Sequence, residues 1–476
     1  MTISTRSSSP ASTPTGLPEV VGHDTLVPCL DGVERPYVNL DNAATTPALR
    51  EVAETVERFG SWYSSVHRGT GYKSRLSTGA YEQARRIVGD FVGVDWDAQT
   101  VIFTQHTTDS VNRLARRFPL ENSDLVLSTV MEHHANLLPW SQKDQVVHVG
   151  LEAGGRGPGI DLDGVRSAFE EYGGRIRLLA VTGASNVTGC MTPIHELARL
   201  AHRNGALIFV DGAQLVPHRP VDLLSSDDPA HIDFMAFSGH KMYAPYGTGV
   251  LVGPRSIFGT GTPAVLGGGA VDAVRLDEVL WTDLPEREEA GSPNVVGAVA
   301  LAKACRVLDA CGMDRIARHE RELTAHMLER LREVPGLRLV GGEDPDPERD
   351  RVAVFAFTMD GYEHGELAAI LGFEYGIAVR NGCFCAHPYI RILAEVSEEE
   401  DRSMWERIQR GERTDMPGFV RASAGCYTAA EHVDALADAL LRIAEQGPQS
   451  TYQVDPATGD HLPGDYRPTF EDRFRI

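Results

Sequence analysis

The residue best suited to covalent chemistry is Lys241, in the segment Ser238-Gly239-His240-Lys241 that follows the apolar run 234–237. In open α/β sheets, ligands bind beyond the carboxyl ends of the strands, where this lysine would lie. Burial beside cationic groups lowers the pKa of a lysine and makes its amine nucleophilic, which suits Schiff-base formation. A surface lysine after a strand is the alternative that the segment alone leaves open.

An acidic residue, Asp211, ends a second apolar run in Phe209-Val210-Asp211-Gly212-Ala213-Gln214. A carboxylate at the end of a buried strand needs a cationic partner, and a pyridinium nitrogen would be one. A lysine Schiff base with an acidic partner to the ring nitrogen is typical of pyridoxal phosphate sites. Capping of the following helix is the alternative role for Asp211.

Two further segments could complete such a site. Thr107 and Thr108 lie in Phe103–Ser110, where a strand runs into a helix start, and could bind phosphate or simply cap the helix. His133, in Met131–Asn136, could stack on an aromatic cofactor or serve as a structural histidine. No spacing is typical of zinc ligands, so we expect no metal site.

Two cysteines, Cys383 and Cys385, lie one residue apart in Arg380–Pro388. A cysteine on a glycine-containing loop near arginine and histidine could be a nucleophile of low pKa. The alternative is a pair of inert thiols. Further along, Arg421 could hold a substrate carboxylate in a bidentate manner, or lie on the surface.

The elements that would position these residues alternate between strand and helix from about residue 36 to 300. Strand-like apolar runs occupy 101–104, 125–127, 176–181, 206–210, 234–237 and 250–252. Helical periodicity lies between them, for example over Tyr81–Phe91 and Ile194–Ala201. Alternation of this kind predicts an α/β fold with a mostly parallel sheet and helices on both faces.

The pattern changes after residue 300, which predicts a smaller α+β domain over 301–447. Expected helices cover 297–312, 315–333, 364–372 and 429–446, and expected strands cover 352–357 and 377–379. Thr428 and Glu431 are interpreted as a capping box for the last helix. Residues 1–25 are interpreted as a disordered tail, and 448–476 as a C-terminal tail whose docking is left open.

Composition narrows the class of function. The 476 residues carry a formal net charge of -22, which disfavours nucleic acid and anionic membranes as partners. No apolar run is long enough for a membrane span, and the first residues lack the apolar core of a secretory signal. Seven scattered cysteines fit a reducing compartment, so we expect a cytoplasmic protein.

In this order, the motifs resemble the class V aminotransferase family of pyridoxal phosphate enzymes, most closely the cysteine desulfurases and selenocysteine lyases. The resemblance covers about residues 36–447. The matching segments are 40–46, 66–69, 104–108, 132–136, 185–189, 211–214, 238–241, 290–294 and 421–423. It implies transferase fold type I, a large domain over 36–300, pyridoxal phosphate as cofactor, an amino acid substrate and a homodimer with its active site at the subunit boundary.

The resemblance also implies roles for single residues. Lys241 would form the Schiff base, Asp211 would bond the pyridinium nitrogen, and His133 would stack on the ring and assist catalysis. Arg421 would bind the substrate carboxylate, and Cys385 falls where desulfurases carry the sulfur-accepting thiol.

The remaining implied roles concern the cofactor. Gln214 would bond the ring hydroxyl, Asn186 would lie near ring and substrate, and Ser292 would reach the phosphate of the neighbouring subunit. The phosphate would otherwise be held by Thr107, Thr108, Ser238 and His240.

The implied reaction cleaves the C–S or C–Se bond of cysteine or selenocysteine, giving alanine and a persulfide on Cys385, with a possible sulfur-acceptor protein as partner. Three departures from the desulfurase pattern leave another class V reaction as the alternative: a C–S β-lyase, an aminotransferase or an epimerase. They are the pair Cys383-Phe384 in place of two histidines, His106 in place of glycine, and an insertion at 395–415, predicted to be helical around 404–408. The insertion could reshape the entrance, bind a partner or be merely solvated. A non-enzymatic scaffold is the third possibility.

Overall fold

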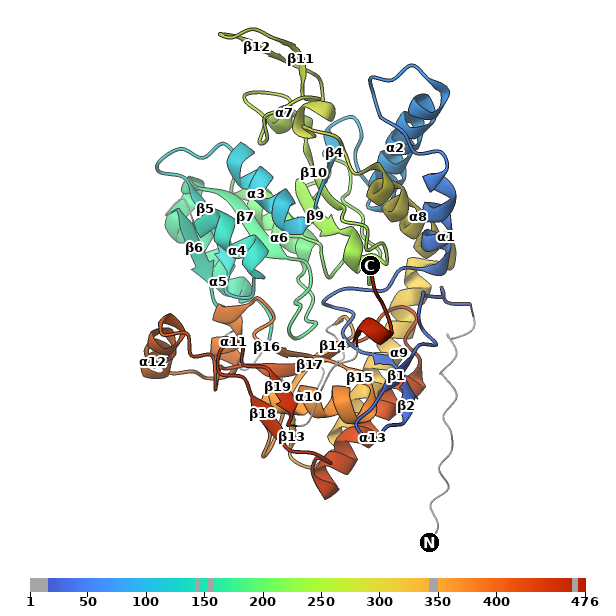
Figure 1. The fold of residues 1–476 in the computed structure, drawn as a ribbon. Helices are drawn as coiled ribbons and strands as arrows, with labels where there is room; N and C mark the ends of the chain where they lie inside the picture. Colours follow the sequence, from blue (N-terminus) through green and yellow to red (C-terminus); the bar gives the residue numbers. More distant parts are fainter. Residues whose placement is uncertain (1–15, 142–144, 153–157, 342–349, 465–469) are drawn as a thin grey trace.

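A seven-stranded sheet forms the centre of the larger part of the molecule, in a computed structural model that describes residues 16–141, 145–152, 158–341, 350–464 and 470–476 (Figure 1). The strand order is β4-β10-β9-β8-β7-β5-β6. The two pairings of β10, with β4 and β9, are antiparallel and the other pairings of this sheet are parallel, so the predicted mostly parallel α/β sheet is confirmed. The strands are β4 (Gln99–Thr104), β5 (Leu125–Thr129), β6 (Val146–Val149), β7 (Ile176–Thr182), β8 (Leu207–Asp211), β9 (Phe234–Ser238) and β10 (Gly249–Pro254).

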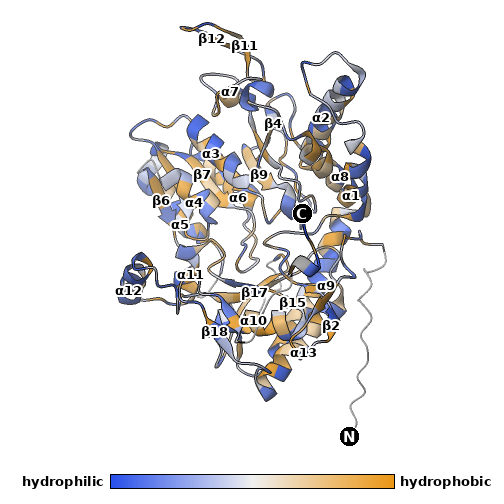
Figure 2. Ribbon diagram, viewed as in Figure 1, coloured by the Kyte–Doolittle hydropathy of each residue, from blue (hydrophilic) through white to orange (hydrophobic). Residues whose placement is uncertain are grey.

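Apolar residues on both faces of these strands explain why the sheet is covered on both sides. Along β4, Val101 and Phe103 join one hydrophobic cluster, whereas Ile102 joins the other, as the period of two in a strand requires. The strands are accordingly coloured as hydrophobic in Figure 2, and hydrophilic residues gather on the outer helices.

Different helices cover the two faces. One face packs against α2 (Tyr72–Phe91), α5 (Leu162–Tyr172), α6 (Ile194–Arg203) and α8 (Val295–Cys311). The other face packs against α3 (Thr107–Arg117), α4 (His134–Ser141) and α7 (Arg255–Phe258).

The C-terminal part is built on a smaller antiparallel sheet, of order β13-β14-β17-β16. Its strands are β13 (Leu337–Leu339), β14 (Val354–Met359), β16 (Arg380–Gly382) and β17 (Phe419–Ser423). The hydrophobic cluster of this part joins the sheet to α9 (Met313–Arg332), α10 (His364–Tyr375) and α13 (Ala430–Gln446).

Three details differ from the expectations. The expected boundary at residue 300 falls inside α8, whose buried residues as far as Leu308 belong to the cluster of the large sheet. The strand β3 (Val38–Asn39) pairs with β15 (Ile377–Ala378) of the C-terminal part, although residues from 36 on were assigned to the large domain. The expected capping box is wrong, because the Thr428 hydroxyl accepts from the Gly425 N–H instead.

Both expected tails contain packed residues. Residues 1–15 lie outside the described residues, but Val20 is 1% exposed and bridges to Leu49, so the interpretation of 1–25 as a disordered tail does not hold at its inner end. After α13, the hairpin of β18 (Tyr452–Val454) and β19 (His461–Pro463) docks on α10, where the Tyr452 hydroxyl donates to the Glu374 carboxylate at 3.0 Å. Within the described ranges, no helix combines the length and the apolar character that crossing a bilayer requires.

Candidate active site

A cavity of about 580 Å³ lies at the C-terminal ends of β4, β8 and β9, and residues of the C-terminal part also line it. It brings together eleven of the twelve predicted site residues. These are Thr107, Thr108, His133, Asn186, Asp211, Gln214, Ser238, His240, Lys241, Cys385 and Arg421. Segments that are far apart in the sequence therefore meet at one place, at the edge of the sheet where α/β folds bind ligands.

Lys241 is carried by the turn that follows β9, so its amine enters the cavity from the sheet edge. The pKa of the amine is lowered from 10.5 to about 8, mainly by burial and also by the nearby Arg421 guanidinium, whereas Asp211 opposes the shift. Such an amine is partly neutral near pH 8 and can act as a nucleophile or accept a proton.

Asp211 ends β8 and is 4% exposed. Burial raises the pKa of its carboxyl, while the Ala213 N–H, which donates to Oδ1 at 3.0 Å, and the Lys241 cation hold it down. The neighbouring Gln214 donates through Nε2 to the Ala43 carbonyl at 2.7 Å, and its buried Oε1 has no hydrogen-bond partner. A ligand with a cationic N–H and a hydroxyl would satisfy both side chains.

His133 follows β5 and is held as a neutral imidazole. Burial, together with Lys241, His134 and Arg421, lowers its pKa to about 3. Its Nδ1 accepts the Ala135 N–H at 3.0 Å, so the proton of the neutral ring is assigned to Nε2. The ring is therefore an uncharged aromatic surface inside the cavity.

Beneath His133 lies Glu132, a fully buried acid that the sequence analysis did not single out. Its carboxyl oxygens accept hydrogen bonds from the Thr129 hydroxyl at 2.7 Å, the Asn136 amide at 2.6 Å and the Thr182 N–H at 3.0 Å. Burial nevertheless raises its pKa to about 8. Its three partners come from separate segments, so this network fixes the loop that carries His133 against β7.

The start of α3 offers a cradle of hydrogen-bond donors. The Thr107 N–H donates to the Ser238 hydroxyl at 2.8 Å, and the two hydroxyl oxygens lie 2.7 Å apart. His106 precedes them with φ -171°, an extended conformation open to any residue, and its Nδ1 caps α3 by accepting the Asp109 N–H. The histidine that replaces the expected glycine is thus a helix cap.

Arg421 reaches the cavity from β17 and is 3% exposed. Its guanidinium donates to the Asn186 carbonyl at 2.9 Å and to Asp41 at 3.2 Å, and lies 4.8 Å from the centre of the Phe384 ring. Asp41 also pairs with Arg380 at 2.8 Å. The role of Asp41 was not predicted, although the residue lies in the segment 40–46 on which the family resemblance partly rests.

Cys385 is exposed at the rim of the cavity, on a loop with two residues in the left-handed region. The φ angles are 50° at Phe384 and 54° at Cys385, a conformation that non-glycine residues adopt only when contacts impose it. Those contacts are a hydrogen bond from the Asn186 amide to the Phe384 carbonyl and one from the His134 N–H to the Cys385 carbonyl, both 2.7 Å.

Ser292, the twelfth predicted residue, lies outside this cavity. It lines a separate one of about 420 Å³ together with the segment 63–68, which includes most of the predicted motif 66–69. Its expected role needs a second subunit and stays a prediction.

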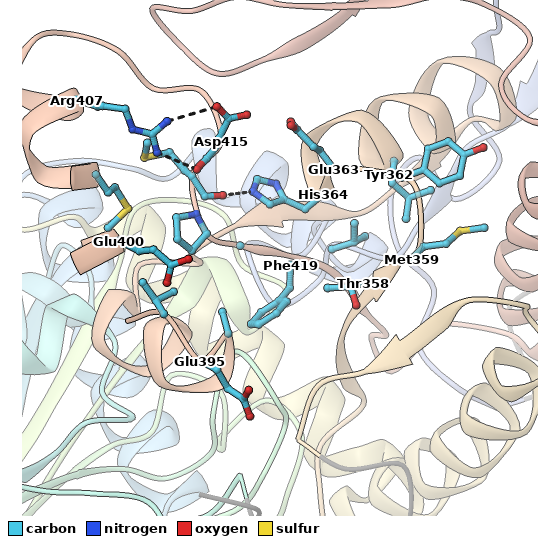
Figure 3. A pocket seen from close by; sticks show the side chains of 18 of the residues that line it. Thr358, Met359, Tyr362, Glu363, His364, Glu395, Glu400, Arg407, Asp415 and Phe419 are labelled. Carbon is cyan, nitrogen blue, oxygen red and sulfur yellow. Dashed lines mark hydrogen bonds and ion pairs between the residues drawn. The ribbon is translucent and has the colours of Figure 1, made fainter. Parts of the chain in front are cut away.

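The insertion 395–415 is helical as predicted, since α12 covers Glu398–Gln409. It lines a third cavity, of about 850 Å³, between α12, α10 and β17 (Figure 3). There Arg407 pairs with Asp415, and His364 contacts the Met416 carbonyl at 2.9 Å. Phe419 lines this cavity, whereas Arg421 of the same strand lines the candidate active site.

Comparison with known proteins agrees with this geometry. Residues 38–436 match the family described as Aminotransferase class-V, and the chain therefore belongs to that family. It is a class V aminotransferase-family enzyme that is similar to cysteine desulfurases.

Among its relatives, the cysteine desulfurase of Haloferax volcanii is 34% identical over 85% of this chain and 89% of its own. One from Escherichia coli O8 is 33% identical over 86% and 93%.

Solved structures give the same result. The apo cysteine desulfurase of Thermococcus onnurineus superposes with a TM-score of 0.74 at 30% identity, over 86% of this chain and 95% of that one. The Escherichia coli cysteine desulfurase CsdA gives a TM-score of 0.71 at 31% identity, with the same coverage of both chains.

Proposed function

We propose that the protein is a pyridoxal phosphate-dependent cysteine desulfurase that forms alanine and a persulfide on Cys385. The observation that carries this proposal is the placement of an exposed thiol, Cys385, at the rim of the cavity that also holds Lys241, Asp211 and Arg421. A lysine and a buried acid alone would suit many reactions of the family. The thiol adds a nucleophile that can take sulfur from a substrate.

The residues of the cavity fit pyridoxal phosphate. Asp211 offers a buried carboxylate to a ring N–H, and Gln214 offers an unpartnered buried oxygen to a ring hydroxyl. The hydroxyls and N–H groups around Thr107 and Ser238 suit a phosphate at the start of a helix, and Lys241 offers an amine for covalent attachment. When bound, the cofactor supplies an electron sink for the substrate carbon that loses its proton.

The chain's own groups then orient the substrate and move protons. Arg421 uses only two of its five N–H donors in its contacts with Asn186 and Asp41, so the others can bind the carboxylate of an amino acid. The Lys241 amine, with its pKa of about 8, removes the proton from the α-carbon of the substrate. The neutral ring of His133 would face the cofactor without adding charge.

The sulfur step belongs to Cys385. Its thiolate attacks the substrate sulfur, so that an S–S bond forms, the bond between sulfur and the β-carbon breaks, and the electron pair stays with the carbon. Protonation of that carbon gives alanine. The terminal sulfur of the persulfide then passes to a thiol of an acceptor, such as a sulfur-acceptor protein.

The active form proposed is a homodimer, because Ser292 and its neighbours form a cavity separate from Lys241 within one chain. In a dimer, Ser292 would contribute to the phosphate site of the partner subunit. Replacement of Ser292 by alanine is expected to weaken cofactor binding.

The test incubates the cofactor-loaded protein with L-cysteine and a thiol reductant, and measures alanine and sulfide. The Cys385→Ser variant should lose both products while it keeps the visible absorbance of the bound cofactor. The matched control is Cys311→Ser, a half-buried thiol that contacts the Gly16 carbonyl, and it should behave like the wild type. Formation of pyruvate and ammonia in wild type and Cys385→Ser alike would instead show a β-lyase.

A further inference from the structure

A cluster of two histidines and an aspartate lies at the edge of the large sheet opposite the candidate active site. His202 is in the last turn of α6, and His231 and Asp233 precede β9 (Figure 1). The Nε2 atom of His202 is 2.9 Å from Asp233 Oδ2, and that of His231 is 3.1 Å from Oδ1. The sequence analysis expected no metal site because it found no spacing typical of zinc ligands, and only the fold brings these three residues together.

The other ring nitrogen of each histidine is already occupied. Nδ1 of His202 is 2.9 Å from the Pro229 carbonyl, and Nδ1 of His231 is 2.6 Å from the Asp228 carbonyl. A carbonyl oxygen only accepts hydrogen bonds, so each Nδ1 carries a proton. If both rings are neutral, the lone pair on each Nε2 atom faces an oxygen of the Asp233 carboxylate. Lone pair and carboxylate repel each other unless a cation lies between the Nε2 atoms and the carboxylate oxygens.

Two protons or one metal ion could supply that cation. Two protons would make both rings cationic, and the rings are stacked with centres only 4.3 Å apart, so they would repel each other. A single divalent ion would bind both rings in their neutral form, so this repulsion would not arise. The hydrogen bonds of the Nδ1 atoms to carbonyls are also the arrangement by which proteins orient histidines that bind metals.

We propose that His202, His231 and Asp233 bind one divalent transition-metal ion, such as Zn²⁺. All their ligand atoms lie within 4.8 Å of one another. Ligand atoms about 2.1 Å from one ion are roughly 3.0–3.4 Å apart at octahedral or tetrahedral angles, close to the two nitrogen–oxygen distances. The histidine side chains are 16% and 17% exposed, which leaves room for water as a further ligand.

The site would be structural. Asp233 is anchored by the Ile208 N–H at 2.9 Å, so an ion there would link α6, β8 and the loop before β9. The extended chain from Asp233 through β9 to Ser238 spans about 17 Å, which separates the ion from Lys241 beyond the other end of the strand. Metal binding should therefore stabilise the fold without taking part in the reaction.

The test uses the full chain loaded with pyridoxal phosphate, stripped with a chelator and dialysed against ZnCl₂ of known concentration. The wild type is compared with His231→Gln and with a matched control, His195→Gln. His195 also lies in α6 and also contacts a carbonyl of the same loop, that of Ala230 at 2.9 Å, but it is outside the cluster. The zinc content per chain is measured by mass spectrometry. Any zinc bound by the cysteines contributes equally to every protein compared, because all variants keep the same cysteines.

We expect His231→Gln to hold one zinc fewer per chain, or to bind it at least about tenfold more weakly, and to lose the rise in unfolding temperature that zinc gives the wild type. His195→Gln should match the wild type. If His231→Gln unfolds in chelator at a lower temperature than the wild type, His202→Gln serves as the second variant. Equal zinc content and equal thermal shift in wild type and cluster variants would overturn the proposal and leave two protons as the cation.

Discussion

The depressed pKa of Lys241 should be shifted in opposite directions by two substitutions, and the size of each shift can be measured. Asp211 raises the pKa of the lysine and Arg421 lowers it, while burial sets the main effect. Asp211→Asn should therefore move the pKa below about 8, and Arg421→Met should move it above. The signs follow from charge alone, because removing a nearby anion destabilises the ammonium and removing a nearby cation stabilises it.

The size of the effect follows from the two pKa values. At pH 7, a pKa of about 8 leaves roughly one amine in ten neutral, against roughly one in three thousand at 10.5. Asp211→Asn can increase the neutral fraction at pH 7 by no more than about tenfold, because that fraction cannot exceed one. Arg421→Met can reduce it much further.

The measurement is competitive acetylation of the cofactor-free protein across pH 6 to 11, read by peptide mass spectrometry. This labelling reports the amine itself and does not depend on cofactor affinity. Lys73, an exposed residue of α2, is the internal reference. A midpoint for Lys241 near 10.5 in the wild type, or shifts of the same sign in both variants, would refute the electrostatic description of the cavity.

Three more predictions concern other parts of the molecule. The pKa of Glu132 is raised from 4.5 to about 8, so its protonated form stabilises the fold fully below pH 4.5 and this contribution is lost as pH rises toward 8. In urea titrations of the cofactor-free protein, the free energy of unfolding of the wild type should therefore fall with pH over this range, and Glu132→Gln should lose that slope. An unchanged slope in the variant would contradict the prediction. Arg85→Met leaves the buried Glu289 carboxylate without its cation and should reduce the free energy of unfolding by about 3–5 kcal/mol, whereas a loss below 1 would show the pair to be dispensable. Gly249→Ala would place a Cβ 2.5 Å from the His106 Cα, next to the start of α3, where the phosphate is proposed to bind. We therefore expect a dissociation constant for pyridoxal phosphate at least about tenfold higher by fluorescence titration. An unchanged constant would argue against a phosphate site at the start of α3.

Strand positions in the large sheet were predictable because their residues are apolar on both faces. Their directions were not, since the run 250–252 carries no mark of the antiparallel orientation that β10 adopts. The strand β6 was missed because Val146–Val149 is short and interrupted by a histidine. The last helix was placed correctly. Its capping box was not, because the Thr428 hydroxyl oxygen accepts the Gly425 N–H of the preceding turn and is not used to cap the helix.

The candidate site was less accessible to sequence reasoning. Each motif alone allowed a structural interpretation, and the roles came from the resemblance between their order and that of a known family. The contacts that orient the predicted residues, such as those of Asp41 with Arg421 or Asn186 with the Phe384 carbonyl, join segments more than a hundred residues apart. Local patterns carry no information about such pairs before the chain has folded.

The proposed site residues come from both sheets, and this has a consequence for fragments of the chain. Lys241 and Asp211 belong to the large sheet, whereas Cys385 and Arg421 come from the C-terminal part. A fragment ending before α9 would keep every group proposed to hold the cofactor from its own subunit, yet it would lack the thiol proposed to accept sulfur and the arginine proposed to bind the substrate carboxylate. On the proposed function, reactivity toward cysteine would require both parts of the chain, and two separately produced fragments would regain it only after they associate.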